Sequence, residues 1–170
     1  MGVPVFVTLG SNIDPQRNLH RAVGLLAEQT QVRRISHVYR SIALGPHGEP
    51  LDQPDYLNAA VLIDLPDGVA ADQLKFRVLR PIEASLGRVR SADKFAPRPI
   101  DLDIALFGDL VDAALGIPDP DILTCAHIAL PLADLDAHFV HPVSGETLAQ
   151  IAARFVGTAG IVRLDADLTP

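Results

Sequence analysis

Cysteine is nearly absent from this sequence, since Cys125 is the only one in 170 residues, and tryptophan is missing altogether. A single cysteine excludes an internal disulfide, so nothing in the sequence requires an oxidising compartment, and we expect a cytoplasmic protein. Long apolar runs are missing too: none reaches the ~18 residues needed to cross a bilayer. The first residues lack a basic segment followed by an apolar one, so we expect no secretory signal.

Positive charge is also scarce, because 14 Lys and Arg residues against 21 Asp and Glu residues leave a net charge of −7. This balance argues against nucleic acid or an anionic membrane as a partner, since both are bound through many basic side chains. One segment departs from the trend and carries Arg88, Arg90, Lys94 and Arg98. Such a run is often only a solvated loop, but it also suits a small anionic ligand.

The composition and the order of apolar segments predict one α+β domain over residues 1–170. Hydrophobic residues make up 48 % and charged residues 21 %, as in ordinary globular domains. Apolar runs and turn signals predict strands at 3–9, 31–39, 57–65 and 100–107. Helices are predicted from Asp14-Pro15 onward and over about 70–86, where Pro81 predicts a kink or a break.

The resulting order, β-α-β-β-α-β, is typical of a ferredoxin-like core, in which helices pack on one face of an antiparallel sheet. A C-terminal helix at about 145–155 and an edge strand at 161–164 complete the prediction. Residues 40–56 contain three prolines and two glycines. We therefore expect a long loop there, and long loops in compact domains are usually functional or mobile.

Asp101 and Asp103 are the main candidates for chemistry. They lie two residues apart in a predicted strand, so both side chains point to one face while Ile100, Leu102 and Ile104 point to the core. Adjacent carboxylates repel each other unless a cation joins them, and oxygen-only ligands favour Mg²⁺ over zinc. Two carboxylates on a strand can also simply face water. With the basic segment just upstream, however, they suit a polyphosphate.

The segment Lys94-x-Ala96-Pro97-Arg98-x-x-Asp101-Leu102-Asp103-Ile104 resembles the signature of the 6-hydroxymethyl-7,8-dihydropterin pyrophosphokinase family of folate biosynthesis. Further blocks of the family follow in order: Leu9-Gly10-Ser11-Asn12, Gln53-Pro54-Asp55-Tyr56-Leu57-Asn58-Ala59-Ala60, Ile82-Glu83 with Gly87-Arg88-Val89-Arg90, and Pro131-Leu132-Ala133-Asp134-Leu135. The resemblance covers most of residues 3 to 150. It implies a single pyrophosphokinase domain with an α-β-α sandwich built on the ferredoxin-like core. No Gly-x-x-x-x-Gly-Lys-Ser/Thr motif of a P-loop enzyme is present.

The resemblance also implies an activity and a nucleotide site. Pyrophosphate would pass intact from ATP to the pterin hydroxymethyl group, leaving AMP. Asp101 and Asp103 would hold two Mg²⁺ ions, and Arg88 and Arg98 would act with them as catalytic residues by stabilising phosphate charge. The remaining residues that the resemblance assigns to the nucleotide are Glu83, Arg90, Lys94 and Ile104.

By the same resemblance, Tyr56 would lie against the pterin ring and Asn58 would pair with its amide edge. The rest of the expected pterin pocket comprises Ser41, Ala43, Leu44, Phe95 and His127. A planar heteroaromatic needs this combination of an aromatic face and a few directed hydrogen bonds. The expected partners are therefore small molecules, ATP and a hydroxymethyl dihydropterin, with neither nucleic acid nor membrane, and we expect a monomer.

Three positions depart from the family pattern. Asp119 stands where the family usually has His, Cys125 where it has Arg, and His127 where it has Phe; Trp is also common at Phe95. Three interpretations stay open: an intact enzyme of a divergent branch, an enzyme for another pterin, and a paralogue that binds its ligands with little turnover. A metal-dependent nuclease or phosphohydrolase using the same aspartates, and a non-catalytic ligand-binding domain, are further alternatives.

Overall fold

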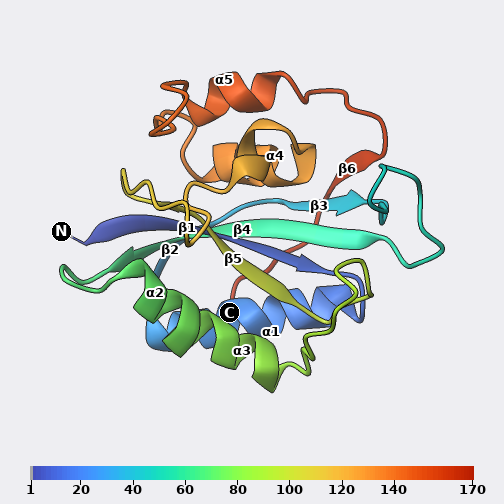
Figure 1. Cartoon of the computed structure of the whole chain (residues 1–170), viewed down its shortest axis with the longest axis horizontal. Coiled ribbons are helices and arrows are strands. Elements are labelled where there is room, and N and C mark those ends of the chain that lie inside the picture. Colours follow the sequence, from blue (N-terminus) through green and yellow to red (C-terminus); the bar gives the residue numbers. More distant parts are fainter. Residues whose placement is uncertain (1) are drawn as a thin grey trace.

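A six-stranded sheet separates two layers of helices in the computed structural model, which describes residues 2–170 (Figure 1). The strand order is β5-β1-β4-β3-β6, and β2 pairs with β4 beside β3. Every pairing in the sheet is antiparallel. The strands are β1 (Val3–Ser11), β2 (Gln31–Ile35), β3 (Val38–Ser41), β4 (Tyr56–Leu65), β5 (Asp101–Phe107) and β6 (Ile161–Leu164). This arrangement confirms the predicted α+β fold.

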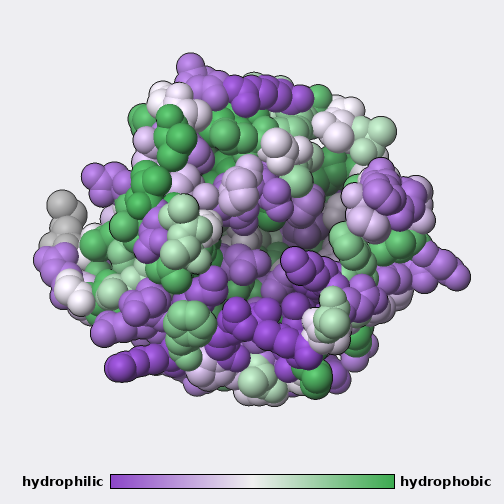
Figure 2. All heavy atoms as spheres, viewed as in Figure 1, coloured by the Kyte–Doolittle hydropathy of each residue, from purple (hydrophilic) through white to green (hydrophobic). Residues whose placement is uncertain are grey.

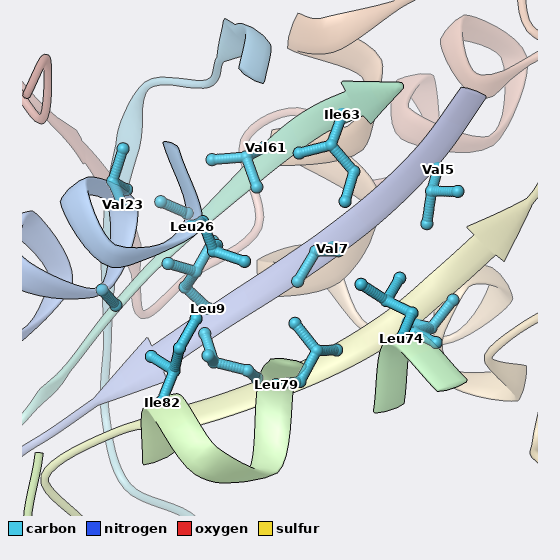
Figure 3. Close-up of a cluster of buried hydrophobic side chains, with 14 of the residues drawn as sticks. Val5, Val7, Leu9, Val23, Leu26, Val61, Ile63, Leu74, Leu79 and Ile82 are labelled. Carbon is cyan, nitrogen blue, oxygen red and sulfur yellow. The ribbon is translucent and has the colours of Figure 1, made fainter. Parts of the chain in front are cut away.

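The first helical layer covers one face of the sheet and forms the larger core (Figures 1 and 3). It consists of α1 (Pro15–Gln29), α2 (Ala71–Leu74), a π-helical turn η1 (Lys75–Leu79) and α3 (Arg80–Ser85). Along α1, Leu19, Ala22, Val23 and Leu26 recur at helical spacing, and all four are fully buried. Figure 3 shows Val23 and Leu26 beside the side chains of β1 and β4, with Leu74, Leu79 and Ile82 beside those of β1.

The second layer covers the opposite face with η2 (Pro120–Leu123, a 3₁₀ helix), α4 (Ala126–Leu135) and α5 (Leu148–Ala153). Its core is smaller and joins Phe6 and Ala60 of the sheet to Leu132, Leu135 and Ile151. Because β1 and β4 are covered on both faces, they are nearly continuous apolar runs rather than alternating ones. The two layers together form the α-β-α sandwich that the resemblance implied.

Several predicted boundaries are wrong in detail. The strand expected over 31–39 is two strands along β4, because the ladder is interrupted at Ser36, whose hydroxyl accepts the Ala60 N–H at 2.8 Å. The predicted 40–56 loop is shorter, since β3 extends to Ser41 and β4 begins at Tyr56. The C-terminal helix spans 148–153 rather than 145–155.

The helix over 71–85 does not end at Pro81. It widens instead into the π-helical turn immediately before that residue, where the Arg80 N–H bonds to the Lys75 carbonyl five residues back. Because proline has no N–H to donate, a local change of hydrogen-bond pattern accommodates it. No helix within residues 2–170 is long and apolar enough to cross a membrane.

Candidate active site

The site lies at the start of β5, directly after the basic segment. Asp101 lies opposite Gly10 and Asp103 opposite Thr8 in the β1–β5 ladder. The intervening Leu102 is only 3 % exposed. Strand alternation therefore places the two carboxylates on one face and the apolar neighbours in the core, as the sequence predicted.

Asp101 is paired with two cations. Its Oδ2 accepts a hydrogen bond from Nη1 of Arg98 at 2.9 Å, and its Oδ1 lies 3.8 Å from Nη2 of Arg88. Nη1 of Arg88 also donates to the Ile100 carbonyl at 3.2 Å. Both arginines of the sequence motifs therefore converge on the start of β5.

Asp103 has no such partner among the salt bridges formed within residues 2–170. Desolvation and the nearby carboxylates of Asp101, Asp119 and Glu83 together raise its pKa to about 7, while Lys75 opposes them. A crowded carboxylate without a cation fits a site for a hard divalent cation. Within 2–170 no three His, Cys, Asp or Glu side chains cluster to enclose a metal, so further oxygen ligands would have to come from a substrate or water.

Two adjoining pockets meet at these residues. One has a volume of about 560 Å³ and the other about 400 Å³. The residues that line both are Lys94, Arg98, Asp101 and Asp103. Hydrophilic residues gather on the lower half of the face shown in Figure 2, below a hollow near its middle. The aspartate pair thus lies where two separate ligands could touch.

The larger pocket brings together all seven residues predicted for the pterin: Ser41, Ala43, Leu44, Tyr56, Asn58, Phe95 and His127. The Asn58 side-chain NH₂ donates to the Ser41 hydroxyl at 2.8 Å and to the Tyr39 carbonyl at 3.2 Å. These bonds fix the amide plane and leave its Oδ1 available to a ligand. Burial raises the pKa of Tyr56 and lowers that of His127, so both side chains are neutral near pH 7.

The smaller pocket is lined by all four residues of the basic segment, Arg88, Arg90, Lys94 and Arg98. Glu83, by contrast, is 1 % exposed and lies behind the pocket. It accepts the Leu102 N–H at 2.8 Å and Nη2 of Arg90 at 2.7 Å. Ile104 packs in the core and is not among the residues that line either pocket.

Comparison with known proteins agrees with this geometry. The model of the 7,8-dihydro-6-hydroxymethylpterin-pyrophosphokinase (HPPK) family matches residues 6–137. The chain belongs to the HPPK family. It is 37 % identical over 158 residues to the 2-amino-4-hydroxy-6-hydroxymethyldihydropteridine pyrophosphokinase of Synechocystis, covering 90 % of this chain and 76 % of that protein. It is 31 % identical to the Haemophilus influenzae protein of the same name, covering 90 % and 93 %.

Some similar proteins are much longer than this HPPK chain. It matches the Pneumocystis carinii folic acid synthesis protein with 32 % identity over 89 % of its own length but only 20 % of that protein. Wild-type HPPK-DHPS of Plasmodium falciparum superposes with a TM-score of 0.68 at 13 % identity, covering 96 % of this chain and 48 % of that one. At that identity the structural likeness supports the fold alone.

The three departures from the HPPK pattern lie at the starts of η2 and α4. Asp119 caps η2 by accepting the Asp121 N–H at 2.9 Å, and it is not among the residues that line either of these two pockets. Cys125 and His127, at the start of α4, line the larger pocket. Burial raises the pKa of the Cys125 thiol, which favours its neutral form. Because a thiol carries no positive charge, Cys125 does not supply the cation expected from arginine at this position.

Two parts of the site were not predicted from the sequence: one residue, Asn12, and one segment, residues 158–161. Asn12, interpreted only as part of a family block after the first strand, bonds to Arg98 and to the segment containing Gln53. Its position directly after the strand was the only available signal. The segment Thr158–Ile161 lines the larger pocket from the C-terminal part of the chain. Nothing in its sequence indicated this, because the contact depends on how β6 pairs with β3.

Proposed function

We propose that this chain transfers pyrophosphate from ATP to the hydroxymethyl group of 6-hydroxymethyl-7,8-dihydropterin, with release of AMP. The observation that carries the proposal is the meeting of two chemically different pockets at Asp101 and Asp103. One pocket is lined by aromatic and apolar side chains with a few directed polar groups, and the other by cations. The first suits a flat heteroaromatic and the second a triphosphate.

The bond changes follow from the products. The hydroxymethyl oxygen forms a bond to the β-phosphorus of ATP, and the bond from that phosphorus to the oxygen bridging to the α-phosphorus breaks. AMP leaves with the electron pair, and the hydroxyl proton is lost to solvent. Because both reactants are held against one pair of carboxylates, attack becomes effectively intramolecular.

Arg88 and Arg98 have charge that can be redirected to the phosphates. In the structure both form ion pairs with Asp101. Arg90 and Lys94 lie on the same pocket wall and add cations on the irregular segment between α3 and β5. In phosphoryl-type transfer, positioning and charge neutralisation supply most of the rate enhancement.

Asp101 and Asp103 would hold Mg²⁺, and their all-oxygen donor set and the unpaired Asp103 fit that role. When bound, Mg²⁺ supplies neutralisation of phosphate charge. The family's two-ion arrangement is part of this proposal.

The acceptor would lie in the larger pocket between Tyr56 and His127. A neutral imidazole can stack on a ring and still donate or accept a hydrogen bond, which the phenylalanine usual in the family cannot do. Asn58 would offer its free Oδ1 to the pterin amide edge. We further propose that the protein is cytoplasmic and monomeric. Light scattering in solution can check the monomeric state.

The test is a coupled assay of AMP release with ATP, Mg²⁺ and the reduced hydroxymethylpterin. AMP should appear only when all three are present, and Asp101→Ala should abolish it while the protein stays folded by circular dichroism. AMP formation independent of the pterin would indicate a hydrolase instead. Folded wild-type protein that releases no AMP at high enzyme concentration would contradict the proposal.

A further inference from the structure

Arg98 lies between two prolines, Pro97 and Pro99, and neither proline has a backbone N–H. Its own N–H is therefore the only backbone donor between Ala96 and Ile100. Its side chain must reach Asp101 from this segment, which β-ladder hydrogen bonds do not hold. The backbone of Arg98 must therefore be held by hydrogen bonds from a residue outside this segment.

Asn12 supplies that contact from the end of β1. It is 2 % exposed, its Oδ1 accepts the Arg98 N–H at 2.8 Å, and its own N–H donates to the Arg98 carbonyl at 3.1 Å. The side-chain oxygen thus takes the place of a backbone carbonyl. Together with the Asn12 N–H, it extends the pairing of β1 and β5 beyond its last register pair, Gly10 and Asp101, and past Pro99 to Arg98.

The NH₂ group of Asn12 reaches in the other direction. It donates to Oε1 of Gln53 and to the Pro54 carbonyl, both at 3.3 Å. Gln53 in turn donates through Nε2 to the Phe95 carbonyl at 2.8 Å. The amide therefore connects the loop that walls the larger pocket to the segment that carries Arg98.

We propose that Asn12 is a positioning residue that aims Arg98 at the reacting phosphates, an inference that rests on the proposed pyrophosphate transfer. Asn12 is not among the residues that line either pocket. It therefore acts through Arg98 and touches neither substrate. Its effect on the reaction depends on the presence of the Arg98 side chain.

The first measurement is hydrogen exchange of the Arg98 amide by NMR, which reports the contact without any turnover. Asn12→Ala removes the acceptor and should speed exchange about tenfold or more. Asn12→Asp keeps an acceptor for the Arg98 N–H but cannot donate to Gln53, so exchange should stay slow. Asn18→Ala is the matched control, because Asn18 is also a buried amide and bonds the Ile13 carbonyl at 2.7 Å, away from Arg98.

The second measurement is a double-mutant cycle in the AMP-release assay. Asn12→Ala should lower kcat by about 10- to 100-fold through misplacement of Arg98, with a smaller change in the KM for the pterin. In an Arg98→Ala background the same substitution should cost less than about threefold. Asn12→Asp should recover most of the kcat, and Asn18→Ala should leave it unchanged.

Unchanged Arg98 exchange in Asn12→Ala, or an equal loss of kcat with and without the Arg98 side chain, would overturn the proposal. If Asn12→Ala does not fold, slow Arg98 exchange together with near wild-type kcat in Asn12→Asp supports it, and fast exchange overturns it. Wild-type protein that forms no AMP but shows the expected exchange pattern would refute the proposed function while supporting the contact between Asn12 and Arg98.

Discussion

At the scale of single residues, the two aspartates of β5 lie in different environments. Asp101 is neutralised by Arg98 and Arg88. Asp103 faces other carboxylates and has its pKa raised to about 7 by burial and by those neighbours. A residue kept in an unfavourable electrostatic environment is characteristic of functional sites, where stability is lower than the fold alone would allow.

Removing the charge of Asp103 should therefore stabilise the metal-free protein while abolishing its activity. Asp103→Asn should raise Tm by about 2 °C in EDTA, because the repulsion from Asp101 and Glu83 disappears. Asp101→Asn should give no such gain, because it loses two ion pairs. Thermal unfolding with AMP assays checks both, with the exposed Asp109→Asn as control. A lower Tm for Asp103→Asn would show that its charge is already compensated.

His141 makes the stability depend on pH. It is 2 % exposed; its Nδ1 accepts the N–H groups of Val143 at 3.3 Å and Ser144 at 3.1 Å, and its buried Nε2 has no partner within residues 2–170. Burial lowers its pKa, with Glu146 opposing. Above the unfolded-state pKa of about 6.5 the stabilisation by the neutral ring is complete. It is lost as pH falls from there through the lowered folded pKa.

The predicted consequence is that the difference in free energy of unfolding between wild type and His141→Asn changes with pH. An asparagine Oδ1 can accept the same backbone N–H groups but does not titrate. Between pH 7.5 and pH 5 the wild type should lose free energy of unfolding relative to the variant, by at most about 1.4 kcal/mol per pH unit. Urea unfolding at the two pH values measures it. A difference that is the same at both would mean that His141 does not titrate in this range.

Several site residues could be predicted from the sequence because their chemistry is local. Asp101 and Asp103 follow from strand alternation, and the basic segment from its charge. The position of Glu83 could not be derived in this way. Its contact with Leu102 joins α3, which ends at residue 85, to β5, which begins at residue 101, and its contact with Arg90 reaches the segment between them. These contacts exist only in the folded protein.

At the scale of elements, the way in which α3 ends determines the position of Arg88. The Gly87 N–H bonds to the Ala84 carbonyl at 3.1 Å and the Arg88 N–H to the Glu83 carbonyl at 3.0 Å. With a φ of +90° at Gly87, this is a Schellman motif. The motif stops the helix and turns the chain so that Arg88 can reach Asp101.

Gly87→Ala should therefore affect both stability and activity. No atom lies within 4 Å of the position of an added Cβ, so only the left-handed backbone is penalised. The expected loss is about 1–2 kcal/mol of unfolding free energy. Turnover should also fall because Arg88 is displaced, whereas Gly87→Asn should lose less of both. Urea unfolding and the AMP assay measure the two effects. Equal losses in both variants would mean that the conformation of residue 87 is not limiting.

Helices and strands could be predicted from the sequence where a single local pattern was strong. Continuous apolar runs predicted β1, β4 and β5. The break between β2 and β3 depends on a hydrogen bond from Ala60 to Ser36, which no local pattern shows. The α4 helix was not predicted as a defined element, because Pro131 lies inside it and Cys125 provides no side-chain cap. Packing on β4, rather than local propensity, accounts for this helix.

At the scale of the whole molecule, three segments distant in sequence surround the aspartates. They are the end of β1, the loop between β3 and β4, and the segment between α3 and β5, joined through Asn12 and Gln53. We predict that residues 42–55 and 88–97 gain protection from hydrogen exchange when a nonhydrolysable ATP analogue, Mg²⁺ and the pterin bind together. Exchange that is equal in the free and ternary states would contradict a closing motion.

The central claim, transfer of an intact pyrophosphate group at the junction of two pockets, is tested most directly by the fate of labelled phosphates. ATP carrying ³²P at the β- or the γ-position is incubated with the enzyme, Mg²⁺ and the reduced hydroxymethylpterin, and the products are separated. Both labels should appear in the pterin product, in equal amounts and together with one AMP per product. Transfer of the γ-label alone, or release of either label as inorganic phosphate without a labelled pterin, would contradict the account.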